Sequence, residues 1–139
     1  MTNHHCKNLI VHCIDFRLGK KIKSYMEERG LLGDCDIVSV AGGVKNTDFI
    51  LEQIGISANL HHIQEVILLN HTDCGAYGGS GKFASFQEER EFHIAEMKKA
   101  GETISKKYPS VKVSLVLAEI REGNETEIAE ITETAEIKK

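Results

Sequence analysis

Residues 7–17 read KNLIVHCIDFR, and they begin the first strand-then-helix unit of the chain. The apolar run at 7–13 predicts a buried strand. Apolar residues then recur at helical spacing from Leu18 to Met26, and Gly30 supplies a stop. This segment therefore predicts a strand followed by a helix, which is the repeating unit of an α/β protein.

The same order recurs in the next segment of the chain. Residues 35–40 (CDIVSV) predict a second strand, and an Ala-Gly-Gly turn follows at 41–43. A cap at 46–47 predicts a helix to about Ile54, and Ser57 can cap another helix. The second unit is therefore a strand followed by more helix.

Two further strands and a long helix complete the pattern. Residues 65–70 (EVILLN) predict a third strand, and a loop rich in glycine follows at 75–81. An amphipathic helix is expected from 86 to 108, before the only proline, and residues 111–117 (VKVSLVL) predict a fourth strand. Strands that alternate with helices pair in parallel through right-handed crossovers, so we predict an α/β fold with a mostly parallel sheet flanked by helices.

The chain has the length of one domain, and 41% of its 139 residues are hydrophobic. No repeat or linker composition interrupts it, so residues 1–139 are predicted to form a single domain. An acidic segment rich in Thr, Glu and Ile begins at residue 122, and its structure at 124–139 is not assigned beyond a small strand or helix.

Composition also limits the possible partners and location. The net charge of −4 and the scattered lysines provide no basic surface for a nucleic acid backbone. No apolar run is long enough to cross a membrane, and no secretion signal is recognised at the start, so a cytoplasmic location and no membrane partner are expected. In that setting, four cysteines indicate thiolate chemistry or metal binding better than a disulfide framework.

Two short motifs carry the candidate chemistry. Cys13, Asp15 and Arg17 occupy every second position as the first strand ends, and extended backbone would place them on one face. His71 and Cys74 form a His-x-x-Cys pair directly after the third strand. The carboxyl ends of parallel strands meet at one edge of a sheet, where open α/β proteins place their ligand sites.

The donor set indicates the metal. Two thiolates and one imidazole suit Zn²⁺ better than Mg²⁺ or Ca²⁺. Structural zinc sites close with four protein ligands, whereas three ligands leave one position open, so this set favours a catalytic zinc. Cys13, His71 and Cys74 are therefore the predicted metal ligands.

Simpler interpretations compete with these assignments. Cys13 alone could be a buried apolar residue, and Asp15 with Arg17 could be an ordinary surface ion pair. The remaining cysteines and histidines are assigned no role, because no spaced partner or site is visible for them. These are Cys6 and Cys35, interpreted as ordinary thiols, His4, His5, His61 and His62, interpreted as solvated, and His93, placed on a helix face.

These motifs together resemble the β-carbonic anhydrases. The shared elements are Cys-x-Asp-x-Arg in HCIDFR, Gly33-Asp34 ahead of IVSVAGG, and His-x-x-Cys in NHTDCGAYG, over roughly residues 9–123. The chain differs from many members of the family in having Ser-Val at 39–40, where they have Arg-Asn. It also lacks an N-terminal helical arm and any tryptophan, and so is similar to the shortest members.

The resemblance implies both fold and activity. Zinc would be held by Cys13, His71 and Cys74, and a zinc-bound hydroxide would convert CO₂ reversibly to bicarbonate. Asp15 and Arg17 would form the catalytic pair beside the open position, and in some family members the aspartate binds zinc in a resting form. The family also implies a homodimer or a higher even oligomer that completes each pocket.

Three other functions stay open at this level. Relatives with the same ligands hydrolyse CO₂ analogues such as carbonyl sulfide or carbon disulfide. A non-catalytic protein that binds zinc or bicarbonate would also fit, because no substrate pocket is identifiable. A thiol redox protein is disfavoured, since the chain contains no Cys-x-x-Cys motif.

Overall fold

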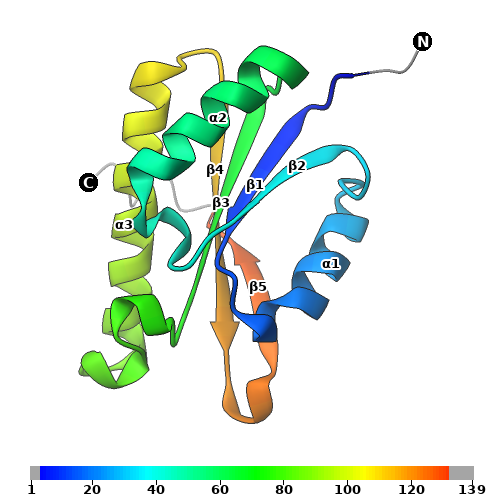
Figure 1. Cartoon of the computed structure of the whole chain (residues 1–139). Helices are drawn as coiled ribbons and strands as arrows, with labels where there is room; N and C mark the ends of the chain where they lie inside the picture. Colours follow the sequence, from blue (N-terminus) through cyan, green and yellow to red (C-terminus); the bar gives the residue numbers. More distant parts are fainter. Residues whose placement is uncertain (1–3, 132–139) are drawn as a thin grey trace.

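The computed structural model describes residues 4–131 and contains one five-stranded sheet with three α-helices. Figure 1 shows α1 on one side of the sheet and α2 and α3 on the other. The strands are β1 (Asn8–His12), β2 (Cys35–Ser39), β3 (Glu65–His71), β4 (Lys112–Ile120) and β5 (Thr126–Glu130). The α-helices are α1 (Gly19–Glu28), α2 (Thr47–His61) and α3 (Phe86–Lys107). The α/β fold predicted from the sequence is confirmed.

The order of the strands across the sheet is β2-β1-β3-β4-β5. The first four strands pair in parallel, and β5 pairs antiparallel with β4. The chain moves outward from β1 to β2, and then crosses over to β3 on the other side of β1. This reversal of direction makes the carboxyl ends of β1 and β3 the topological switch point, which is where sheets of this kind bind their ligands.

The central strands are buried on both faces, which explains why their sequences are almost continuously apolar. Leu9 and Val11 of β1 pack with α2 and α3, whereas Ile10 between them packs with α1. In β3, Leu68 and Leu69 alternate between the two faces in the same way. The sheet therefore separates two apolar clusters, and together these hold the strand ends in a fixed relative position.

The predicted break in the second helical segment is wrong, because α2 is one continuous helix of 15 residues. The Asn46 side chain accepts a hydrogen bond from the backbone N–H of Phe49, as expected of a cap. Ser57 instead lies buried inside the helix. Gly55 does not interrupt the helix, and a Cβ at this position would lie 2.5 Å from the Tyr108 hydroxyl. This glycine is therefore explained by close packing.

The sequence left open whether the acidic C-terminal segment begins with a small strand or a helix. Residues 126–130 form β5 and pair with β4, so the small-strand alternative is correct for this part. The rest of the segment, 132–139, lies outside the described residues. Among residues 4–131, no helix combines the length and apolar composition that crossing a membrane requires.

Candidate metal centre

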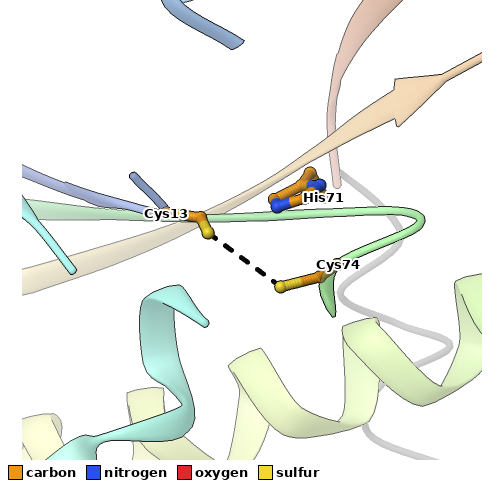
Figure 2. Close-up of side chains that lie close together, drawn as sticks. All are labelled: Cys13, His71 and Cys74. Atoms are coloured by element: carbon orange, nitrogen blue, oxygen red, sulfur yellow. Dashed lines mark hydrogen bonds between the residues drawn. The ribbon is translucent and has the colours of Figure 1, made fainter. Parts of the chain in front are cut away.

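The predicted ligands come together at the carboxyl ends of β1 and β3. Cys13 follows β1 directly, His71 is the last residue of β3, and Cys74 lies three residues further on. Figure 2 shows the two cysteine sulfurs pointing toward one another, with the His71 ring beside them. The side chains are buried, with exposed fractions of 6% for Cys13, 1% for His71 and 2% for Cys74.

The distances in this group are those of a metal site. The Sγ atoms of Cys13 and Cys74 are 4.0 Å apart, and both cysteines are free thiols. Two thiolates at about 2.3 Å from a tetrahedral zinc would lie about 3.8 Å apart. The three ligand atoms all lie within 4.8 Å of one another. The group is therefore able to hold a metal ion.

One nitrogen of His71 is left available to a metal. Its Nδ1 lies 2.6 Å from the backbone carbonyl of Thr72, so Nδ1 donates and Nε2 carries the lone pair. Among the described residues, this buried Nε2 has no hydrogen-bond partner. A metal-ligating histidine is fixed in the same way, by a hydrogen bond from its other nitrogen. The donor set thus fits Zn²⁺.

The two thiols are hydrogen-bonded to each other, and this contact lowers the pKa of the Cys13 thiol and raises that of the Cys74 thiol. The backbone N–H of Gly42 also points at the Cys13 sulfur, at 3.4 Å. Gly42 has a φ of 82°, and a Cβ there would lie 2.9 Å from Lys45 Cβ. The glycine turn expected from the sequence thus permits close backbone approach to Cys13.

Asp15 and Arg17 form a two-point ion pair beside the thiolates. The guanidinium donates from Nε to Asp15 Oδ1 at 3.0 Å and from Nη2 to Asp15 Oδ2 at 2.7 Å. These bonds from Arg17 lower the pKa of Asp15 to about 2. Asp15 Oδ2 also lies 3.9 Å from His71 Nε2, so the carboxylate borders the candidate metal position.

The expected backbone of this motif is wrong, although the side chains do meet. The chain leaves extended conformation after β1, and Arg17 lies in a short 3-10 helix, η1 (Phe16–Leu18). Asp15 caps this helix by accepting from the backbone N–H of Arg17. The turn, and not an extended alternation, brings the guanidinium back onto the carboxylate.

The residues that hold Arg17 from the other side were not predicted from the sequence. Its guanidinium donates to the carboxylate of Asp73 at 3.0 Å and to the Asp73 carbonyl at 2.9 Å. Glu89, buried on α3, accepts from the Asp73 backbone N–H and from the Ser80 hydroxyl. The one local signal was Asp73, an acidic residue inside the His-x-x-Cys motif. Glu89 has no such signal, since it meets the site only through the tertiary fold.

His93 also differs from the sequence interpretation, which placed it on a helix face without a role. It lies on α3 and is fully buried. The Asn70 side-chain amide, on β3, lies 3.1 Å from His93 Nδ1, and Asn70 Oδ1 accepts from the Val44 backbone N–H. The ring also packs edge-on against Tyr77. Burial lowers the pKa of His93 to about 4.

This burial predicts acid sensitivity. Between pH 6.5 and about 4 the unfolded chain binds a proton at His93 that the folded chain excludes, so stability falls as pH falls. The loss at this one residue is on the order of 3 kcal/mol. Urea unfolding of the metal-free wild type and His93→Gln from pH 7.5 to 4.5 should show a shallower pH slope in the variant. Parallel slopes would contradict the prediction.

The fold and the site define a doubly wound α/β protein with a buried group of two cysteines and one histidine at its switch point. Residues 3–131 match the family model described as "Putative carbonic anhydrase". Because this match covers most of the chain, the chain belongs to this carbonic anhydrase family.

Comparison with individual proteins agrees with this placement. A Rickettsia bellii protein named as uncharacterized is 32% identical over 124 residues, which cover 81% of this chain and 76% of that protein. An uncharacterized Rickettsia conorii protein is 30% identical over 131 residues, covering 81% and 70%.

Two solved structures share the fold. The crystal structure of carbonic anhydrase from Streptococcus mutans has a TM-score of 0.60 at 24% identity, covering 95% of this chain and 86% of that one. Carbonic anhydrase from Glaciozyma antarctica has a TM-score of 0.62 at 20% identity, covering 88% and 80%. At these identities the likeness concerns the fold alone.

Proposed function

We propose that this protein catalyses the reversible hydration of CO₂ to bicarbonate with a zinc ion held by Cys13, His71 and Cys74. The observation that carries the proposal is the buried group of these three residues with the ionised Asp15 beside it, in a chain of the carbonic anhydrase family. Three protein ligands leave the fourth position of a tetrahedral ion open, which is the arrangement of catalytic zinc.

The chemistry divides between the metal and the side chains around it. When bound, zinc would act as a Lewis acid that lowers the pKa of a coordinated water toward neutrality. Cys13 and Cys74 supply two negative charges that satisfy the cation, and the Thr72 carbonyl fixes the His71 ring. Burial of all three side chains limits access of bulk water to the ligands.

Asp15 is the proposed hydrogen-bond acceptor for the attacking oxygen. Arg17 Nη2 donates to Asp15 Oδ2, and a carboxylate oxygen has a second lone pair for another donor. An acceptor in this position would orient the attacking oxygen toward CO₂. Arg17 holds the carboxylate ionised and, through its second contact with Asp73, holds it in place.

Stopped-flow measurement of CO₂ hydration tests this proposal. Zinc-loaded protein should accelerate hydration well above the buffer rate, and chelator-treated protein should not. Carbonyl sulfide and carbon disulfide serve as alternative substrates in the same preparation. A zinc-replete protein that hydrolyses an analogue but leaves CO₂ at the buffer rate would reassign the substrate, and one inactive on all three would favour a binding role.

We also propose that the chain assembles as a homodimer that covers apolar residues near the site. Phe16 and Ile14, on either side of Asp15, have exposed fractions of 85% and 64%. Ile37 on the edge strand β2 is also exposed. Contiguous exposed apolar side chains often mark interaction surfaces, so Ile14 and Phe16 are the residues that we assign to the interface.

Phe16→Ser is therefore expected to halve the molar mass that light scattering reports. The matched control is Leu60→Ser, which removes another exposed apolar side chain near the end of α2 and should leave the mass unchanged. A wild-type chain that is monomeric and active would refute the dimer.

A further inference from the structure

A second cluster of metal-binding side chains lies at the opposite end of the sheet from the candidate metal centre. It gathers where the chain enters β1, where β2 begins and where α2 ends. The backbone N–H of Cys6 donates to the carbonyl of His61 at 3.1 Å, which fastens the segment before β1 to the last turn of α2. The rings of His4 and His61 then meet edge to face, with centroids 4.6 Å apart.

Asp36 fixes the orientation of His61. Its Oδ2 lies 2.6 Å from His61 Nδ1 and also accepts from the Ser57 hydroxyl at 2.6 Å. Burial alone would raise the pKa of Asp36, but the hydrogen bonds from Ser57 and His61 lower it overall. An ionised acceptor places the ring proton on Nδ1, so the lone pair of His61 is on Nε2. This is the carboxylate–histidine arrangement that supports metal-ligating histidines.

The other ring nitrogen of His61, Nε2, faces a second imidazole. His4 Nε2 lies 3.1 Å from His61 Nε2. Two histidine nitrogens at about 2.0 to 2.1 Å from a tetrahedral zinc would lie about 3.4 Å apart. A thiol is also close, because Cys6 Sγ, an Asp36 oxygen and a His61 nitrogen all lie within 4.8 Å of one another.

We propose that Cys6, Asp36 and His61 form the core of a second site for a divalent transition metal such as Zn²⁺, and that His4 joins it through its contact with His61. Imidazole and thiolate donors select this class of ion over Mg²⁺ or Ca²⁺. Burial and the nearby charge of Asp36 raise the pKa of the Cys6 thiol, so the cation itself must displace its proton. The bound ion would fasten the N-terminal segment to α2.

This site is separate from the proposed catalytic one. Cys6 precedes β1 and Cys13 follows it, and a strand of five residues spans roughly 16 Å. The side chains of His61 and Asp36 are 28% and 29% exposed, so the outer cluster is more accessible than the buried group. We therefore expect weaker, exchangeable binding that supports structure and does not contribute to turnover.

Calorimetric titration of the untagged full-length chain with Zn²⁺ tests the outer site. The background is Cys13→Ser/Cys74→Ser, which removes both buried thiolates, so that binding at the outer site is measured whether or not the proposed function is correct. One equivalent should bind and raise the melting temperature. Adding His4→Asn or Cys6→Ser should weaken this binding at least 10-fold.

The matched control is His5→Asn, because the His5 ring packs against His62. This variant should bind zinc as tightly as its background. If the double serine background does not fold, the same changes are made in the wild type, where Cys6→Ser should remove one of two equivalents. A background without zinc binding, or equal binding after His4→Asn and Cys6→Ser, would overturn the proposal.

Discussion

Cys13→Ser is expected to abolish the zinc that the chain retains after dialysis against a chelator. The hydroxyl matches the thiol in shape but is a much poorer zinc ligand, and Cys13 provides one of only three protein donors. Loss of a supporting contact costs about 10- to 100-fold in metal affinity, so loss of a ligand should cost at least about 100-fold. Elemental analysis should therefore fall from one zinc per chain to none.

Cys35→Ser provides the matched control for this experiment. Cys35 begins β2, and burial raises the pKa of its thiol to about 12, so it is not poised as a thiolate. This variant should retain one zinc per chain. Retention of a full equivalent in folded Cys13→Ser would contradict the ligand assignment.

Asp15→Asn is expected to retain zinc and lower the rate of CO₂ hydration by about 100-fold or more. The amide keeps the size of the side chain but removes the charge that Arg17 stabilises. Misplacement of a reacting group by about 1 Å can cost about 100-fold in rate, which sets this magnitude. Stopped-flow rates should be compared at equal zinc content, so that a loss of metal is not mistaken for a loss of catalysis.

Asp48→Asn is a suitable control for the charge change. Asp48 is exposed in the first turn of α2 and belongs to neither motif of the site, so Asp48→Asn should keep the wild-type rate. Equal rates for Asp15→Asn and the wild type would show that the carboxylate is not needed for the reaction.

The strands and their parallel order were predictable because burial on both faces leaves a strong apolar signal in β1 and β3. The continuity of α2 was not predictable. Gly55 and Ser57 can each interrupt a helix or lie inside one, and tertiary contacts decide which occurs. Gly55 is explained by the Tyr108 hydroxyl, and Ser57 by its hydrogen bond to Asp36. Neither contact can be read from neighbouring sequence.

The grouping of Cys13 with His71 and Cys74 was predictable for a different reason. Each motif follows a strand, and adjacent parallel strands end at one edge of the sheet. The support given by Glu89 was not predictable, because this residue reaches the site from α3. Contacts made across elements leave no spacing pattern in the sequence.

The second cluster, formed by His4, Cys6, Asp36 and His61, was even less predictable from the sequence. Cys6 has no spaced partner in the sequence, and His61 was interpreted as solvated. The fold brings them together because the segment before β1 meets the end of α2, 55 positions further along the chain (61 − 6). Such a cluster becomes visible only once the topology of the sheet is known.

The most direct test of the proposed function is a zinc titration of the metal-free Cys6→Ser variant, with the rate of CO₂ hydration followed by stopped flow. This variant removes a proposed ligand of the outer site and leaves Cys13, His71 and Cys74 intact. The rate should rise in proportion to added zinc and stop rising at one equivalent per chain. A folded chain that binds one equivalent and leaves hydration at the buffer rate would contradict the proposed function.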